Sequence, residues 1–305
     1  MADFSIIQHI ADDIKTITIQ GATNIAKAAC EVMQNELKRQ LFSSHEEMLD
    51  FVVKASQILI DARETEPLLR NGMKYAKSKI AQWATQAELS DAFGEYLGWI
   101  EREEASRPMI GAELIQDGEQ IVTHCHSGSV VKVLTKARDS GKKIHVYNTE
   151  TRPLYQGRKT SMDLFKAGVP DTMITDDMAP FFIDNNYENN IHIHRVFLGS
   201  DCIRPNGDTF NKVGSFAISL SAAQSNVPLY IVGSLLKIDM TRTIGIETRS
   251  GSELWPEAPV GIDILNYAFD MVPAKYITGI ITEFWVIKPQ DLEAEVQKHY
   301  PRMLQ

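Results

Sequence analysis

The sequence has few cysteines, no basic excess and no long apolar run. Its 305 residues include only three cysteines, Cys30, Cys125 and Cys202, which are too few and too scattered for the disulfide framework of a secreted domain. Lysine and arginine number 31 against 40 aspartates and glutamates, a net charge of −9, so we do not expect a general nucleic-acid-binding face. No run of about 18 apolar residues occurs, and we expect no membrane span.

Two further signals are missing. The opening Met1-Ala-Asp-Phe-Ser-Ile-Ile carries an early acid and lacks the basic-then-apolar order of a signal peptide, so we expect a protein of the reducing cytoplasm. His124 and His126 flank Cys125, but the chain has no second ligand pair with CxxC or HxxxH spacing. Because neighbours in an extended turn point to opposite sides, we predict that this cluster binds no metal.

The first third of the chain is predicted to form successive helices, with no strand signal before residue 121. Thr23 or Asn24 is a candidate N-cap for the second helix. Ser44 and Glu47 have capping-box spacing ahead of the third. Further helical patterns run to about residue 102. Apolar residues recur at helical spacing in the opening segment, at Phe4, Ile6, Ile7, Ile10, Ile14 and Ile17.

After residue 118 the pattern changes to strand, helix, strand. Alternation of this kind predicts an α/β fold with a Rossmann-like, mainly parallel sheet covered on both faces. We therefore expect an N-terminal helical domain, residues 1–112, followed by a sheet domain, residues 113–305. The predicted strands are 121–123, 143–147, 171–175, 194–198, 228–232 and 279–282, and the predicted helices between them are 130–138, 160–167, 179–185 and 214–224.

The segment Gln120–Val130 combines a short apolar strand, a tight polar turn and the start of a helix. Amides at such a helix start are unpaired and point at whatever lies beyond the strand end. Cys125 sits in the turn, where a positive helix end and access to solvent lower a thiol pKa. A lone cysteine is more often a small buried apolar residue, but these surroundings favour a functional Cys125.

Polar and charged residues gather just after several predicted strands. In a parallel sheet these loops meet at one edge, where ligands bind. A thiol, carboxylates, an arginine, an amide and two lysines at one crevice suit proton transfer on an anionic small molecule. The residues concerned are Cys125, His126, Glu150, Arg152, Gln156, Asp176, Asp201, Asn211, Lys212 and Lys237.

Several of these positions also have a purely structural interpretation. Asp176, Asp177 and Asp201 each stand where a carboxylate can cap a helix. Asn206-Gly-Asp208 is most simply a turn. The other structural candidates are an ion pair between Glu150 and Arg152 and the two cysteines without polar context, Cys30 and Cys202.

A set of loop motifs, in this order, resembles one family. That family joins the alpha, beta and delta subunits of translation initiation factor 2B to methylthioribose-1-phosphate isomerase and archaeal ribose-1,5-bisphosphate isomerase. A weaker match, Gln20-Gly-Ala and Asp61-Ala-Arg63, lies in the helical region. The motifs are Thr123-His-Cys-His-Ser, Thr149-Glu-Thr-Arg-Pro-x-x-Gln-Gly157, Thr175-Asp-x-Met-Ala, Gly199-x-Asp201, Asn206-Gly-Asp with Asn211-Lys-x-Gly214, and Asn266-x-Ala-Phe-Asp-x-x-Pro273 with Ile281-Thr-Glu283.

The resemblance implies an aldose-1-phosphate to ketose-1-phosphate isomerase. The isomerases of the family carry a cysteine and an aspartate, matched here by Cys125 and Asp201, and the initiation-factor subunits generally lack that pair. A helix follows Thr-His-Cys almost at once, as in ribose-1,5-bisphosphate isomerases, which makes ribose 1,5-bisphosphate the leading substrate and ribulose 1,5-bisphosphate the product. Two alternatives remain: methylthioribose-1-phosphate isomerisation, and a non-catalytic subunit that senses a sugar phosphate or nucleotide.

The same resemblance implies roles for individual residues, without a metal or cofactor. Asp201 would donate a proton to the ring oxygen, and Cys125 would take one from carbon 2. Gln20 stands where the family usually has arginine, and Thr23 where ribose-bisphosphate isomerases tend to keep glycine, which leaves other aldose 1-phosphates open. A homo-oligomer, dimer or hexamer, and a place in nucleotide salvage are also implied. The implied substrate-binding residues are Gln20, Gly21, Ala22, Thr23, Arg63, His126, Ser127, Gly128, Arg152, Gln156, Asn211, Lys212 and Lys237.

Overall fold

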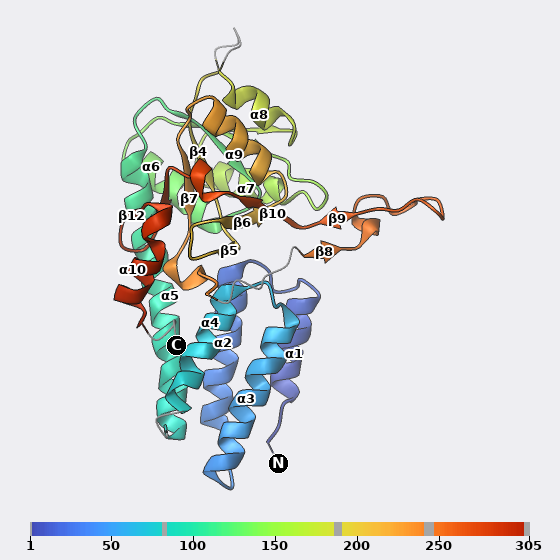
Figure 1. Ribbon diagram of the computed structural model, residues 1–305, viewed down its shortest axis with the longest axis vertical. Coiled ribbons are helices and arrows are strands. Elements are labelled where there is room, and N and C mark those ends of the chain that lie inside the picture. The colour runs from blue at the N-terminus through green and yellow to red at the C-terminus, as the bar shows by residue number, and fades with distance from the viewer. Residues whose placement is uncertain (1, 81–83, 186–190, 241–246, 302–305) are drawn as a thin grey trace. The chain divides into compact units, whose positions relative to one another are not determined.

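The structure, a computed structural model, describes residues 2–80, 84–185, 191–240 and 247–301. The chain divides into two compact units (Figure 1). The helical unit contains the chain as far as Glu103, together with Leu236–Met240 and the segment from Ala294. The sheet unit contains Glu104–Leu235 and the later stretch that ends at Glu293. No helix in the described ranges is long and apolar enough to cross a membrane.

The helical unit buries one apolar face of each helix. Ser44 begins the third helix as predicted, and its hydroxyl accepts a hydrogen bond from the Glu47 amide at 3.1 Å. In the first helix Ile7 and Ile14 are buried on the same face, about two turns apart. The elements are α1 (Ser5–Lys15), α2 (Ala22–Arg39), α3 (His45–Ala62), α4 (Pro67–Ile80), the first part of α5 (Gln86–Leu114), η1 (Leu235–Lys237) and α10 (Leu292–His299), the last two reaching across the division.

The start of α2 differs from the sequence prediction. Neither Thr23 nor Asn24 caps the helix, which begins at Ala22 directly after Gly21. Gly21 has a φ of +86°, a conformation that glycine adopts without steric cost. The side-chain amide of Asn24 instead donates back to the Gln20 carbonyl at 3.1 Å. The first free amides of α2 therefore follow immediately after Gln20-Gly21.

The segment Leu236–Met240 belongs to the helical unit. The predicted single boundary after residue 112 would instead place it in the sheet domain. The Asn71 amide donates to the carbonyls of Leu236 at 2.9 Å and Ile238 at 2.8 Å. Arg70 forms a 3.1 Å ion pair with Asp239. Lys237, expected in the sheet domain, therefore lies in the helical unit. The two partners of Asn71 lie 165 and 167 positions away from it in the sequence, and contacts at such a separation leave no local sequence pattern.

Helix α5 is longer than predicted and runs through the division between the units. It continues to Leu114 with Pro108 inside it, whereas the sequence pattern suggested an end near residue 102. A proline within a helix removes one backbone hydrogen bond. Ala112 and Ile115, at and just beyond its last turn, pack into the core of the sheet unit, and this burial favours the continued helix.

The sheet unit confirms the predicted Rossmann-like, mainly parallel α/β sheet. Seven strands lie in the order β12-β11-β7-β4-β1-β2-β3, and every neighbouring pair is parallel except β11 with β12. The chain order along the sheet reverses between β1 and β4, which is where ligands bind in doubly wound sheets. The strands are β1 (Gln120–His124), β2 (His145–Thr149), β3 (Asp171–Ile174), β4 (Ile193–Leu198), β7 (Leu229–Val232), β11 (Gly279–Ile281) and β12 (Val286–Ile287).

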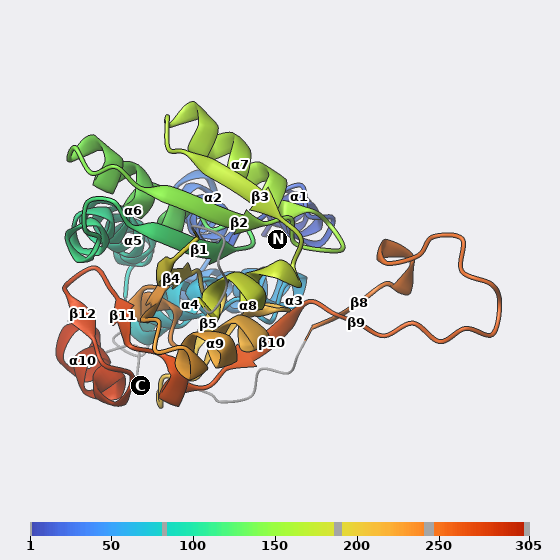
Figure 2. The ribbon, with the colours of Figure 1, turned by 90° about the horizontal axis from the view of Figure 1, so that it is seen from above.

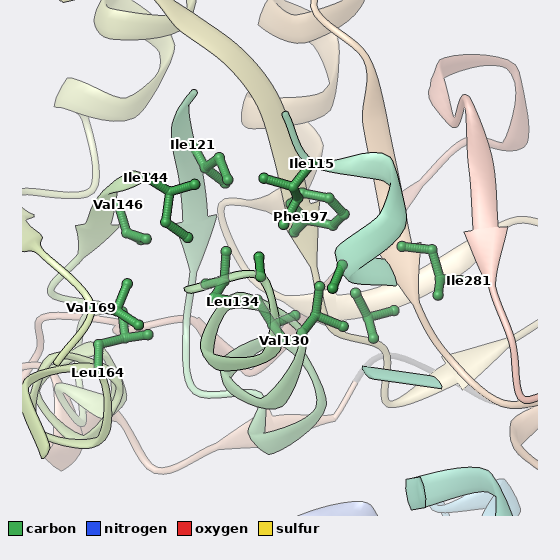
Figure 3. Packing of buried hydrophobic residues seen from close by; sticks show 14 residues of the cluster. Ile115, Ile121, Val130, Leu134, Ile144, Val146, Leu164, Val169, Phe197 and Ile281 are labelled. Atoms are coloured by element: carbon green, nitrogen blue, oxygen red, sulfur yellow. The ribbon is translucent and has the colours of Figure 1, made fainter. Parts of the chain in front are cut away.

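Helices cover both faces of this sheet (Figure 2). On one face lie the end of α5, α6 (Gly128–Asp139) and α7 (Gln156–Lys166), and on the other lie α8 (Met178–Ile183) and α9 (Ser215–Gln224). Figure 3 shows the core beneath α6 and α7, where Phe197 and Val146 from the strands meet Leu134 and Leu164 from the helices. Each fully buried side chain of this size contributes roughly 1.5–3 kcal/mol.

Several short strands were not predicted because two to four residues are too few to show alternation. Among them, β6 places Asn211 and Lys212 in a strand instead of the predicted loop, since Lys212 pairs with Phe269. The segment between β8 and β9 extends away from the sheet (Figure 2). The remaining elements are β5 (Cys202–Ile203), β6 (Thr209–Lys212), β8 (Thr248–Arg249), η2 (Gly251–Glu253), β9 (Asn266–Tyr267), β10 (Phe269–Val272), η3 (Ala274–Tyr276) and η4 (Pro289–Asp291).

Candidate active site

Cys125 and Asp201 leave the sheet from neighbouring strands. Cys125 directly follows β1, and Asp201 is the third residue after β4. The parallel register pairs His124 with Leu198, so the two strand ends lie side by side at the switch point. A glycine is needed after β4, because a Cβ at Gly199 would lie 2.7 Å from the Ser127 Cβ. The structure thus brings the predicted thiol and carboxylate to one place.

The backbone of Cys125 is held in an unusual conformation. Its φ is +67°, in the left-handed region that costs a non-glycine residue roughly 1–2 kcal/mol. The Cys125 amide donates to the Thr151 hydroxyl at 3.0 Å, and its carbonyl accepts from the Thr160 hydroxyl at 2.9 Å. Strained residues that are fixed from both sides are typical of functional sites.

The thiol of Cys125 is less acidic than the sequence predicted. Burial raises the pKa of Cys125 to about 12, because a thiolate loses its hydration there. Lys212 is the strongest charge acting on it and lowers this pKa, whereas Asp201 raises it. The expectation of a lowered pKa is therefore wrong for this structure, since desolvation outweighs the helix start and the lysine. The resting Cys125 is a thiol.

Lys212 and Asn211 approach the site from β6. Both are 5% exposed. The Lys212 ammonium lies 5.8 Å from the centroid of the Phe269 ring, and the Asn211 amide donates to the Ser215 hydroxyl at 2.8 Å. A buried cation beside a thiol suits the binding of an anionic substrate group, because charge in such surroundings is costly unless it is paired.

Arg152 lies shortly before α7, and Gln156 is the first residue of that helix. The Gln156 Oε1 atom is buried and has no hydrogen-bond partner, so this acceptor is available to a sugar hydroxyl. Gly157 allows α7 to approach the end of β2, because a Cβ there would lie 1.7 Å from the Thr149 carbonyl oxygen. The Arg152 guanidinium hydrogen-bonds the Tyr155 hydroxyl and donates to the Leu254 carbonyl at 3.3 Å.

The residues after Cys125 have supporting contacts. His126 Nδ1 lies 3.1 Å from the Thr160 hydroxyl, which itself holds the Cys125 carbonyl. Ser127 is the N-cap of α6, and its hydroxyl accepts from the Val130 amide at 3.4 Å. Gly128 is exposed, and a Cβ there would meet nothing within 4 Å. The start of α6 is therefore open to a ligand.

The other predicted binding residues belong to the helical unit. Gly21 and Ala22 begin α2, a helix start with no acidic residue in its first turn. The Arg63 Nε atom lies 3.4 Å from Glu66 Oε1. Lys237 is buried in η1. The residues in question are Gln20, Gly21, Ala22, Thr23, Arg63 and Lys237.

Sequence reasoning missed the role of Asp176. Its carboxylate accepts from the amides of Thr151 and Arg152, both at 2.8 Å. It therefore braces the loop that holds Cys125, and it does not cap α8, which follows Asp177 without a side-chain cap. The motif around Thr175 contained this residue, but the motif gave no indication of its partner.

The two histidines beside Cys125 have different partners. His124 Nδ1 lies 2.6 Å from the Thr149 hydroxyl, and Nε2 lies 2.9 Å from the Val213 carbonyl. His126 instead contacts Thr160 of α7. Within the ranges that the structure describes, no group of three or more histidine, cysteine, aspartate or glutamate side chains is placed to hold a metal ion.

Acid is expected to destabilise the protein partly through His126. Burial, followed by the charge of Lys159, lowers the pKa of His126 to about 4, and Asp163 opposes this. The unfolded chain takes up the proton near a pKa of about 6.5, so between about pH 6.5 and 4 the unfolded state binds more protons and stability falls as the pH falls. The side chain is 21% exposed, and the loss amounts to at most about 3 kcal/mol.

Urea unfolding of the wild type and of His126→Gln at several pH values between about 7 and 4.5 measures this loss. The variant should lose part of the pH dependence. His9→Gln is a matched control, because His9 is 75% exposed, and it should follow the wild type. An identical pH dependence in His126→Gln would contradict the expectation.

Comparison with known proteins decides the family. Residues 18–289 match the model described as the initiation factor 2 subunit family. The chain belongs to this family. The match spans both units, and all of the strand-end residues described above lie inside it.

Two sequence relatives carry the names of sugar-phosphate isomerases. The chain is 33% identical over 306 residues to the ribose 1,5-bisphosphate isomerase of Methanocaldococcus jannaschii, covering 98% of this chain and 97% of that one. It is 31% identical over 304 residues to the methylthioribose-1-phosphate isomerase of Pelotomaculum thermopropionicum, covering 92% and 82%.

Solved structures show the same fold. The crystal structure of the translation initiation factor eIF-2B of Pyrococcus horikoshii OT3 aligns with a TM-score of 0.80 at 23% identity and covers 93% of this chain and 97% of its own. The 5-methylthioribose 1-phosphate isomerase of the same organism aligns with a TM-score of 0.75 at 28% identity, covering 96% and 87%.

Proposed function

We propose that the protein converts ribose 1,5-bisphosphate to ribulose 1,5-bisphosphate. The observation that carries the proposal is the position of Cys125 and Asp201, after neighbouring strands at the switch point of the sheet, where their charges act on each other. The M. jannaschii relative of nearly equal length is named ribose 1,5-bisphosphate isomerase. Relatives named methylthioribose-1-phosphate isomerase support the same enzyme class, the interconversion of aldose and ketose phosphates.

The reaction needs an acid and a base together, and one proton transfer provides both. In the resting site the thiol of Cys125 is protonated, because burial and Asp201 both raise its pKa. Moving that proton to Asp201 leaves a thiolate and a carboxylic acid. Lys212, which lowers the pKa of Cys125, favours the thiolate.

Ring opening comes first. Asp201 gives its proton to the ring oxygen, and the bond between that oxygen and carbon 1 breaks. Carbon 1, which keeps its phosphate, is left electron-deficient. Cys125 as thiolate then removes the proton from carbon 2, and the electron pair forms a double bond between carbons 1 and 2.

The enol then collapses to the ketose. Cys125 returns its proton to carbon 1, while the carboxylate of Asp201 takes the proton from the hydroxyl on carbon 2. The oxygen on carbon 2 becomes the carbonyl, and the pair returns to its state before ring opening, with Asp201 as the carboxylic acid and Cys125 as the thiolate. No electron acceptor is required, because the oxidation of carbon 2 balances the reduction of carbon 1.

We propose a role for the predicted binding residues of each unit by itself. In the sheet unit, Gln156, Asn211 and Lys212 hold hydroxyls or a phosphate, with the start of α6 and its supporting His126, Ser127 and Gly128 beside them. In the helical unit, the start of α2 and Arg63 offer backbone amides and a guanidinium suited to a 1-phosphate, and Lys237 offers an ammonium suited to a second phosphate. Gln20 in place of an arginine weakens the binding of the 1-phosphate, so this phosphate is held more by backbone amides.

A homo-oligomer, a cytoplasmic location and a place in nucleotide salvage stay predictions. The segment between β8 and β9 carries exposed Trp255, Val260 and Leu265, and apolar surface of this kind commonly marks a contact with another protein. A structural neighbour from C. thermophilum was solved as a tetrameric eIF2B-beta2-delta2 complex, with a TM-score of 0.73 at 16% identity. At that identity the likeness shows the fold alone.

A panel of aldose 1-phosphates tests the proposed substrate. The protein is incubated separately with ribose 1,5-bisphosphate, methylthioribose 1-phosphate and ribose 1-phosphate, and ¹³C NMR follows the appearance of a ketone carbon. We expect ketose from the bisphosphate with a kcat/KM at least about tenfold above that for the other two, because Lys237 and the 5-phosphate then interact. Preference for methylthioribose 1-phosphate would overturn the substrate, and binding without any ketose would favour a sensing subunit.

A further inference from the structure

His124 is a buried histidine that the proposed reaction does not use. It precedes Cys125 directly and is 1% exposed. Burial lowers its pKa, so the ring is neutral near pH 7. Both ring nitrogens are occupied: Nε2 lies 2.9 Å from the Val213 carbonyl and Nδ1 lies 2.6 Å from the Thr149 hydroxyl.

The hydrogen bonds around His124 have one consistent direction. A carbonyl oxygen only accepts, so Nε2 carries the proton and donates to Val213. Nδ1 then accepts from the Thr149 hydroxyl. Thr149 has no second proton, so its oxygen accepts from the Thr151 hydroxyl at 3.2 Å. Thr151 in turn accepts from the Cys125 amide at 3.0 Å.

This chain of hydrogen bonds starts and ends beside the reacting groups. It begins at the amide of Cys125 and ends at the carbonyl of Val213, the residue that follows Lys212 in the chain. Its members come from the ends of β1 and β2 and from the loop after β6, and Thr149 and Thr151 are fully buried. A longer contact of 3.4 Å from Thr151 to the Thr149 carbonyl does not interrupt it.

The loop that carries Val213 fits closely against the His124 ring. Gly214 has a φ of +108°, and a Cβ there would lie 3.1 Å from both Cε1 and Nε2 of the ring. The loop is further fixed by Asp270, whose carboxylate accepts from the Gly214 amide at 2.7 Å. Few other positions remain for the Val213 carbonyl once the ring is in place.

We propose that His124 is a positioning residue, which holds Lys212 beside Cys125 by fixing the carbonyl of Val213. The consequence for turnover rests on the proposed function, but the placement of the lysine does not. Lys212 is the strongest charge acting on the thiol and favours its ionisation. The rate at which Cys125 reacts with an alkylating reagent therefore reports the lysine's position without any substrate.

Two substitutions test the contacts of the two ring nitrogens of His124 separately. His124→Gln can place an amide N–H where Nε2 was and so keep the bond to Val213. His124→Asn can reach only the Thr149 side. The reaction of Cys125 with iodoacetamide at about pH 9, located by mass spectrometry of its peptide, is expected to slow about tenfold in His124→Asn and at most about threefold in His124→Gln.

Lys212→Met and a matched histidine complete the experiment. Lys212→Met should slow alkylation about tenfold by itself, and the double variant with His124→Asn should be no slower than Lys212→Met alone, because both act through one charge. His194→Gln is the control: its ring accepts from the Gln120 amide at 3.1 Å, at the other end of β1. It should alkylate at the wild-type rate.

Additive effects in the double variant, or wild-type alkylation in His124→Asn, would overturn the proposal. If circular dichroism shows that the His124 variants are unfolded, Thr149→Val takes their place, since it removes one hydroxyl at constant volume, and its expected slowing is about threefold. Wild-type alkylation in a folded Thr149→Val would overturn the proposal equally. In turnover, kcat of His124→Asn should fall about 100-fold and more than KM rises. If the variants alkylate as expected but the wild type shows no turnover, the proposed reaction is contradicted and the positioning role of His124 stands.

Discussion

Cys125→Ser is expected to lower kcat for ribose 1,5-bisphosphate by about 10³-fold or more, because a hydroxyl is far too weak an acid to supply the base that takes the proton from carbon 2. The fold should be retained. Serine has nearly the volume of cysteine, and the bonds to Thr151 and Thr160 that fix position 125 come from the backbone. KM should change little, since phosphate contacts are untouched.

NMR time courses with wild type and variant at equal concentration measure this loss, and circular dichroism checks the fold. Cys30→Ala is the matched control, because Cys30 is buried in the helical unit and should keep kcat within about twofold, although its cavity lowers stability. A Cys125→Ser protein that turns over within about tenfold of the wild type would remove the thiol from the mechanism.

Asp201→Asn is expected to have two effects of opposite sign. Without a carboxyl group the ring oxygen receives no proton, and kcat should fall by about 10²–10⁴-fold. Because Asp201 raises the pKa of Cys125, its removal should make the thiol more acidic and its alkylation faster. The backbone amide of residue 201, which donates to the Phe210 carbonyl at 3.0 Å, is unaffected, so the strand end should stay in place.

Measuring both quantities on one preparation makes this prediction specific, because general damage to the site would slow both reactions. Asp177→Asn serves as control, since that side chain is exposed and caps nothing in α8; it should leave both rates unchanged. Slower alkylation in Asp201→Asn would show that the carboxylate does not act on the thiol as described.

The sequence predicted the part of the fold that depends on local pattern. The six parallel strands and the helices after them carry apolar runs long enough to show their periods, and the motifs at their ends located Cys125 and Asp201. Strands such as β6 and β12 were not predicted, because two to four residues are too few to show a period. Lys237 was assigned to the wrong unit because Asn71, far away in the chain, holds its segment.

Electrostatic properties were harder to predict than positions. The turn after β1 suggested an acidic thiol, yet burial outweighs the helix start and raises the pKa of Cys125. A sequence shows which groups are neighbours along the chain, but the loss of water around a sulfur depends on all elements packed against it. The hydrogen bonds from Cys125 through Thr151, Thr149 and His124 join the ends of different strands, so they depend on the fold and leave no pattern in the sequence.

The central claim is that one sugar contacts both Cys125 and Asp201, and a crystal structure of Cys125→Ser with ribulose 1,5-bisphosphate tests it most directly. The account predicts carbons 1 and 2 within about 3.5 Å of the hydroxyl at position 125, and the oxygen on carbon 4 or carbon 2 within hydrogen-bonding distance of Asp201. A sugar bound with its first two carbons away from both side chains would contradict the account.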